Sequence, residues 1–89
     1  LLDLGHTAVT SHWLNFDKNE FVKTCLDNTV AVHVSNNNGK KDQHKSLTKN
    51  CWQTSQLKLF KNLPITLETM NLNVTQIKNN IKIAQTSLL

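Results

Sequence analysis

The hydrophobic pattern is most regular in the last thirty residues of the chain. From residue 60 onward, apolar side chains recur at alternating intervals of three and four. Nine of them would share one side of a continuous helix: Phe60, Leu63, Leu67, Met70, Val74, Ile77, Ile81, Ala84 and Leu88. This spacing is typical of a helix that packs along one narrow stripe against another helix. It predicts a coiled-coil helix over residues 63–89.

The clearest local signal for a helix start lies at Asp17. Its side chain can accept hydrogen bonds from the first-turn amides, and Glu20, three residues later, can reach back to the cap. Phe16 and Phe21 stand at the two positions of a hydrophobic staple. Together these residues predict a helix that begins at residue 17.

The far end of this helix is ambiguous. Residues 29–34 alternate between β-branched and other side chains, as a half-buried strand does. The chain shows no second convincing strand to pair with this segment, and an isolated strand would leave its backbone groups unsatisfied. We therefore expect one helix over residues 17–34, with a strand at 29–34 as the alternative.

The other segments complete a helical interpretation. Residues 1–16 are expected to be an irregular lead-in, and the Asn-rich residues 35–41 a loop. Residues 42–62 are expected to form a further helix, with Asp42 as its cap. Pro64 then marks a kink or a new helix start, because proline suits the first turn of a helix.

Composition agrees with helices and a small core. The chain has 89 residues, two glycines and one proline, which fits elements joined by few turns. Hydrophobic residues make up 38%, below the usual share of about 45–50%. No apolar run approaches the roughly 18 residues of a transmembrane helix. The predicted fold is all-α: a single domain over residues 1–89, in which a small helical bundle with a long C-terminal amphipathic helix completes its core against a partner.

The stripe also suggests a function. It spans roughly 43 Å at 1.5 Å per residue, more than either preceding helix could cover alone. Its flanks are almost uncharged and supply little of the usual pairing code, and the small Ala84 suits a bulky partner side chain, as in a hetero-oligomeric bundle. We expect a cytoplasmic, non-enzymatic coiled-coil scaffold or adaptor subunit of a hetero-oligomeric complex, of trafficking or cytoskeletal type. The nine stripe residues would bind other helical subunits.

Two alternatives follow from the lysines and the cysteines. The net charge is +4, and one basic segment could contact phosphates through Lys40, Lys41, Lys45 and Lys49. The chain has no arginine, the residue of bidentate base and phosphate recognition, so nucleic-acid binding is the weaker hypothesis. Cys25 and Cys51 could form one disulfide in a secreted or surface protein, although two buried free thiols are the preferred interpretation.

Metal and catalytic motifs are not recognisable in the sequence. Zinc motifs place their ligands about two to five residues apart. The spacings here, His6 to His12, Cys25 to His33 and His44 to Cys51, do not match. No glycine-rich phosphate loop is present, and the six acids are dispersed: Asp3, Asp17, Glu20, Asp27, Asp42 and Glu68. The sequence therefore predicts no metal, no cofactor and no enzyme activity.

Overall fold

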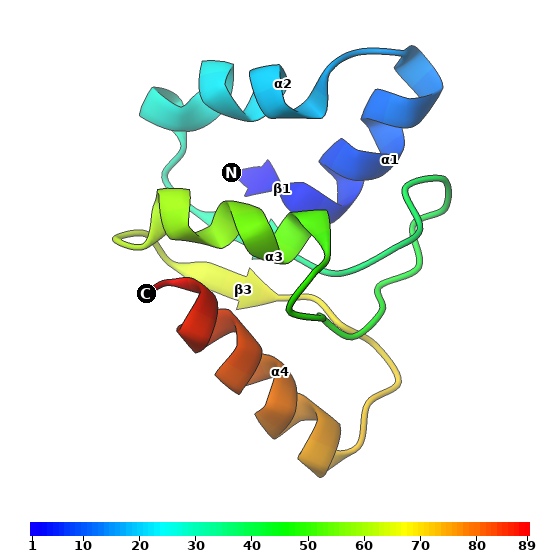
Figure 1. The fold of residues 1–89 in the computed structure, drawn as a ribbon, viewed down its shortest axis with the longest axis vertical. Coiled ribbons are helices and arrows are strands. Elements are labelled where there is room, and N and C mark those ends of the chain that lie inside the picture. Colours follow the sequence, from blue (N-terminus) through cyan, green and yellow to red (C-terminus); the bar gives the residue numbers. More distant parts are fainter.

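A computed structural model describes all 89 residues and shows a three-stranded parallel sheet with four α-helices (Figure 1). The strands pair in the order β1-β2-β3. Their bounds are β1 Leu2–Asp3, β2 Val32–Val34 and β3 Ile65–Leu67. The helices are α1 Leu4–Leu14, α2 Lys18–Cys25, α3 Trp52–Gln56 and α4 Val74–Ser87, with 3-10 turns η1 Leu26–Asn28 and η2 Leu57–Phe60.

The prediction of an all-α bundle is wrong, because the chain has a mixed α/β fold without a coiled coil. Residues 32–34 form the central strand, so the strand alternative for residues 29–34 was the better interpretation. Val32 pairs with Leu2 on one side and with Ile65 on the other. Both partner strands are too short to show a period of two, which is why neither was recognised.

The predicted helix start at Asp17 is confirmed. The Asp17 side chain accepts hydrogen bonds from the amides of Asn19 and Glu20, and the rings of Phe16 and Phe21 lie 5.3 Å apart. The helix ends far earlier than predicted, at Cys25, because the chain must turn into the central strand. The segment expected to be an irregular lead-in instead holds β1 and α1.

The two C-terminal helices are also shorter than predicted. Residues 42–51 contain no helix, and only α3 and η2 form within the segment 42–62. Strand β3 follows Pro64, and α4 begins ten residues later at a capping box between Asn73 and Gln76. The predicted coiled-coil helix over 63–89 is therefore a strand, a turn and a helix.

One face of the sheet carries the hydrophobic core. Side chains from β1, β2, α1, α2, η2, α4 and the loop before α3 form one cluster: Leu2, Leu4, Val22, Val32, Val34, Leu47, Leu57, Phe60 and Ala84. Strand residues that alternate with these point to the opposite face. There Asp3, His33 and Thr66 lie side by side in the strand register. The sheet thus has an apolar face covered by the core and a polar face.

Helix α4 presents a different side to the core than the stripe predicts. It buries Asn80 and Ala84, whereas Val74, Ile77 and Ile81 are 67%, 46% and 42% exposed. Of the other stripe residues, Phe60 and Ala84 are buried in the chain's own core, Leu63, Leu67 and Leu88 pack against it, and Met70 is exposed. No helix is long and apolar enough to cross a membrane.

Candidate metal centre

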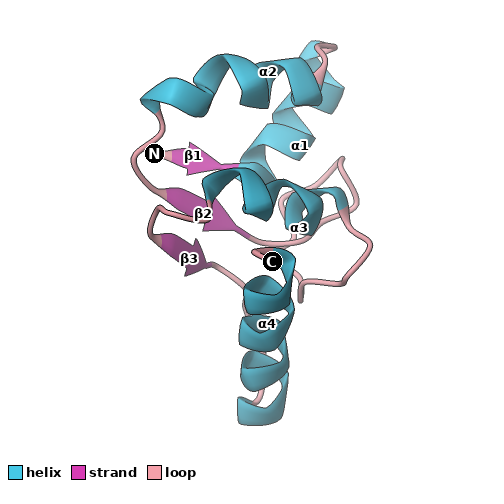
Figure 2. Ribbon diagram, turned by 60° about the vertical axis from the view of Figure 1, so that its left-hand side comes forward, coloured by secondary structure: helices cyan, strands magenta, loops and turns pink.

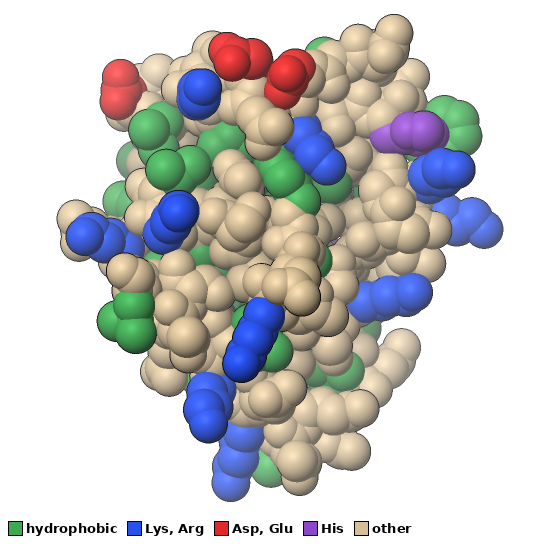
Figure 3. All heavy atoms as spheres, viewed as in Figure 1, with side chains coloured by type: hydrophobic (Ala, Val, Ile, Leu, Met, Phe, Trp, Pro, Cys, Tyr) green, Lys and Arg blue, Asp and Glu red, His purple; other side chains and the backbone are tan.

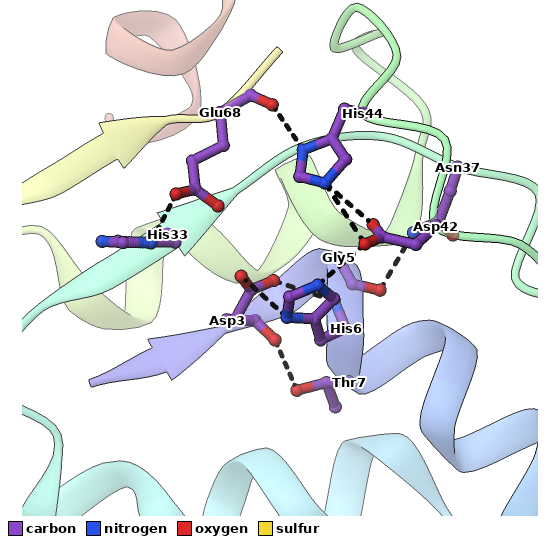
Figure 4. Close-up of polar contacts among 9 residues, drawn as sticks. All are labelled: Asp3, Gly5, His6, Thr7, His33, Asn37, Asp42, His44 and Glu68. Atoms are coloured by element: carbon purple, nitrogen blue, oxygen red, sulfur yellow. Dashed lines mark hydrogen bonds and ion pairs between the residues drawn. The ribbon is translucent and has the colours of Figure 1, made fainter. Parts of the chain in front are cut away.

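The carboxyl ends of all three strands meet at one edge of the sheet, because the strands are parallel. In α/β sheets, ligands bind at this edge. Strand β1 ends at Asp3, and Glu68 directly follows β3. The same edge gathers three histidines and a third carboxylate, and the complete cluster is Asp3, His6, His33, Asp42, His44 and Glu68 (Figure 4).

His6 is held from both sides by carboxylates. It lies in the first turn of α1, where the N-cap Asp3 accepts a hydrogen bond from the His6 amide at 2.8 Å. The same carboxylate lies 3.1 Å from Nδ1 of the His6 ring. On the far side of the ring, Nε2 lies 2.9 Å from an Asp42 oxygen. The helix cap therefore also sets the direction in which the imidazole points.

His44 approaches Asp42 from the opposite direction. Its Nδ1 donates to the backbone carbonyl of Glu68 at 2.7 Å, which assigns the proton to Nδ1 and turns Nε2 toward Asp42 at 3.2 Å. The bond to the Glu68 carbonyl, opposed by partial burial and assisted by Asp42, raises the pKa of His44 above its usual value. The backbone of His44 has φ +49°, a left-handed conformation that is uncommon outside glycine. Such backbone strain clusters at functional sites.

The spacing of these three side chains fits a metal ion. Donor atoms of His6, Asp42 and His44 all lie within 4.8 Å of one another. Zinc bound to nitrogen and oxygen at about 2.0–2.1 Å places neighbouring ligands about 3.3 Å apart. The distances of 2.9 Å and 3.2 Å from Asp42 to the two Nε2 atoms are within a few tenths of an ångström of that value.

A second group of donors adjoins the first on the polar face of the sheet. Asp3, His33 and Glu68 are each half-buried, and their donor atoms also lie within 4.8 Å of one another. Nδ1 of His33 lies 2.9 Å from a Glu68 oxygen. Asp3 links the two groups because its carboxylate also contacts His6. The edge thus contains two three-residue donor sets that share neighbours.

A loop docked onto α1 brings Asp42 and His44 to this edge. An antiparallel bridge between Asn36 and Lys45 closes the loop. The Asn37 amide group donates to the Gly5 carbonyl at 2.9 Å. A Cβ on Gly5 would lie 2.7 Å from the Ser35 hydroxyl oxygen, so a larger residue there would require Ser35 to shift. Tight docking keeps Asp42 within reach of His6.

Lys40, one of the lysines named as a possible nucleic-acid contact, adjoins an exposed aromatic side chain, because Nε1 of Trp13 donates to its backbone carbonyl at 2.7 Å. Lys40, Lys41, Lys45 and Lys49 are all exposed, and they lie along the loop and the segment that leads to α3. Nε1 of Trp52 donates to Asn19, and its ring is covered by Lys18 at 4.8 Å. Trp52 is therefore engaged within the chain. Both cysteines are free thiols.

The sequence rules did not identify this cluster of donors because they search for ligands that are close in the chain. His6 and Asp42 are separated by thirty-six positions and meet because the loop after β2 docks onto α1. Two local signals were present: Asp42 and His44 are two residues apart, and Asp3 and His6 are three apart. Such short pairs are too common to indicate a metal site alone. No family model, curated protein or solved structure matches this chain.

Proposed function

We propose that this chain binds divalent transition-metal ions at the carboxyl edge of its sheet, and that the ions serve metal-dependent catalysis. One observation carries the proposal. The Nε2 atoms of His6 and His44 converge on the Asp42 carboxylate, while the Nδ1 atom of each ring is held by an outer partner. Metal-binding histidines are oriented in this way, with the second ring nitrogen fixed by a carboxylate or a backbone carbonyl.

The electrostatics of the convergence favour a cation. A neutral imidazole that carries its proton on Nδ1 presents a lone pair at Nε2. When both rings are neutral, two such lone pairs face the acceptor oxygens of the Asp42 carboxylate, and either a proton on each Nε2 or a metal ion among the three groups supplies the positive charge that this arrangement requires. A metal ion supplies that charge and accepts all three donors at once.

The donor set indicates both the metal and its use. Two imidazoles and one carboxylate suit Zn²⁺ and neighbouring transition metals, and the more oxygen-rich set of Asp3, His33 and Glu68 also suits Mn²⁺. Three protein ligands leave a coordination position open, as in catalytic rather than structural zinc sites. A bound ion there would polarise a substrate oxygen or lower the pKa of a bound water to about 7.

Binding of Zn²⁺ to chelator-treated protein, measured by calorimetry, tests the proposal. His6→Ala and His44→Ala should each weaken binding by about tenfold or more. His12→Ala is the matched control, because His12 is an exposed histidine of the same helix α1 and lies outside the cluster. Equal affinity in all three variants, or no binding by the unaltered chain, would refute a metal centre.

Stoichiometry separates the two donor sets. The unaltered chain should bind two ions, and His33→Gln should leave one, since His33 belongs only to the second set. Co²⁺ absorption should report the same numbers, because tetrahedral cobalt gives strong visible bands. A single equivalent that His33→Gln leaves intact would restrict the proposal to His6, Asp42 and His44.

The scaffold function expected from the sequence loses its coiled-coil basis, because the stripe does not form one continuous helix. The part of the stripe that stays exposed lies on α4. That surface is a separate feature of the molecule, remote in the sequence from every residue of the metal centre except Glu68.

A further inference from the structure

Helix α4 carries an unpaired apolar ridge, which we define as Val74, Ile77 and Ile81. These residues are spaced three and four apart and therefore line up along two turns on one side of the helix. All three are exposed, although isoleucine is among the residues most often buried in proteins. In Figure 2 the helix projects away from the sheet, and its first turns are the part farthest from it.

The ridge continues the surface through which α4 already packs. Ala84 and Asn80 are buried, and α4 contacts α3 and η2 on that side. Ile77 and Ile81 lie next to this buried line around the helix, since residues three and four apart are neighbours on a helix surface. A further helix placed beside α4 would therefore extend the layer of helices that already covers the sheet.

Charge indicates what kind of helix would fit. Lys78 and Lys82 border the ridge on the side away from Ala84, and α4 contains no acidic residue. From residue 45 to the C-terminus the only acidic side chain is Glu68, which is paired with His33. Figure 3 shows lysines across the lower half of the molecule, whereas the acidic side chains in that view are confined to the top.

A second copy of the chain does not meet this requirement through α4. Two copies packed ridge to ridge would bring Lys78 and Lys82 of both helices together with no acid between them, and like charges at an interface disfavour it. We infer that α4 docks an amphipathic α-helix of another protein, whose apolar stripe covers the ridge and whose Asp or Glu residues face Lys78 and Lys82.

The size of the ridge sets the expected strength. A standard interface buries about 800 Å² on each partner, and three partly exposed side chains supply only a fraction of that area. Docking through the ridge should therefore be of micromolar strength and reversible. Neither the ridge nor its lysines belong to the metal centre, so the two proposals stand or fall separately.

The test uses a fluorescent synthetic peptide: an amphipathic helix with a leucine stripe flanked by glutamates, compared with the same stripe flanked by lysines. Anisotropy titrations against the full chain should show the glutamate peptide binding about tenfold more tightly. Ile77→Asp should weaken that binding by about tenfold. Asn79→Asp is the matched control, because it adds the same charge to the same helix about 160° away from Ile77.

Charge reversal gives a second, independent variant. The double variant Lys78→Glu and Lys82→Glu should bind the lysine-flanked peptide more tightly than the glutamate-flanked peptide. This reversal tests the charge contacts separately from the apolar contact. Binding of neither peptide, an unchanged preference after charge reversal, or equal effects of Ile77→Asp and Asn79→Asp would overturn the inference. Light scattering that shows a dimer of the unaltered chain and a monomer of Ile77→Asp would also overturn it, because the ridge would then bind a second copy of the chain. Sedimentation with phosphatidylserine vesicles, lost in Ile77→Asp, would overturn it in favour of a membrane surface.

Discussion

Two adjacent asparagines of α4 should differ sharply in their contribution to stability. Asn80 is 1% exposed, and its side-chain oxygen accepts a hydrogen bond from the backbone amide of Leu47 at 2.6 Å. Its side-chain nitrogen donates to the Gln76 carbonyl at 2.8 Å. Asn79 is exposed and has no such role. Replacing each by alanine therefore compares a buried anchor with a surface residue of the same type.

The magnitude follows from the groups that lose their partners. In Asn80→Ala the buried Leu47 amide loses its acceptor, which costs about 1–3 kcal/mol. The lost bond to Gln76 adds roughly 0.5–1.5 kcal/mol. Alanine is the better helix former and offsets up to about 0.7 kcal/mol. The expected loss is roughly 2 kcal/mol, whereas Asn79→Ala should stay within about 0.5 kcal/mol of the unaltered chain.

Urea unfolding followed by circular dichroism measures the difference. With a slope of about 1–3 kcal/mol per molar urea, Asn80→Ala should lower the midpoint by roughly 1 M at an unchanged slope. Midpoints of Asn80→Ala and Asn79→Ala that agree within error would show that α4 is not held to the core through Asn80.

Two further changes test the loop and the thiols. Gly5→Ala should destabilise the fold by about 1 kcal/mol in the same urea assay. Crowding of the buried Ser35 costs about 1–3 kcal/mol, whereas replacing glycine by alanine stabilises the helix by at most about 1 kcal/mol. An unchanged or raised urea midpoint would mean that Ser35 can move aside. Partial burial raises the pKa of Cys51, but hydrogen bonds, chiefly from the Thr54 hydroxyl, outweigh it and place the pKa below its usual value. The rate of iodoacetamide alkylation should therefore reach half its maximum at a lower pH for this thiol than for a free peptide thiol, and Thr54→Val should move that midpoint upward. A midpoint indifferent to Thr54→Val would remove the hydroxyl as the cause.

The helix start at Asp17 could be predicted because its determinants are local. A cap side chain, two amides and two adjacent rings all lie within six consecutive residues. The capping box at Asn73 is equally local, but it falls inside the continuous helix that the stripe predicts and was therefore not recognised as a helix start. Where an element is stabilised by contacts between residues that are neighbours along the chain, the sequence is sufficient to predict where that element begins.

The stripe failed because its spacing crosses element boundaries. Phe60 belongs to a 3-10 turn and Leu67 to a strand, so the spacing of three and four between Phe60, Leu63 and Leu67 does not place these residues on one side of a helix. Within α4 the periodicity is real, but it does not decide which side faces the core. Two hydrogen bonds of Asn80, with the small Ala84 next to it, place the contact about a sixth of a turn away from the most apolar side.

The central strand was discounted by an argument that holds only for neighbouring strands. A hairpin partner would lie a few residues away, but the parallel partners of Val32 are Leu2 and Ile65, some thirty positions distant on each side. Parallel strands need a crossover of a dozen or more residues. A strand-like segment flanked by two helical segments of that length is therefore itself evidence for a parallel sheet.

The proposed metal centre depends on that same topology. Once residues 32–34 are a strand with parallel partners, the residues just beyond each carboxyl end must gather at one edge. Asp3 ends the first strand, Glu68 follows the third, and the loop after the second strand contains Asp42 and His44. Ligand spacing along the chain is irrelevant in such a site, because the sheet, not the sequence interval, sets the distance between donors. A metal site of this class is found by first assigning the strands and then searching their carboxyl ends for imidazoles and carboxylates.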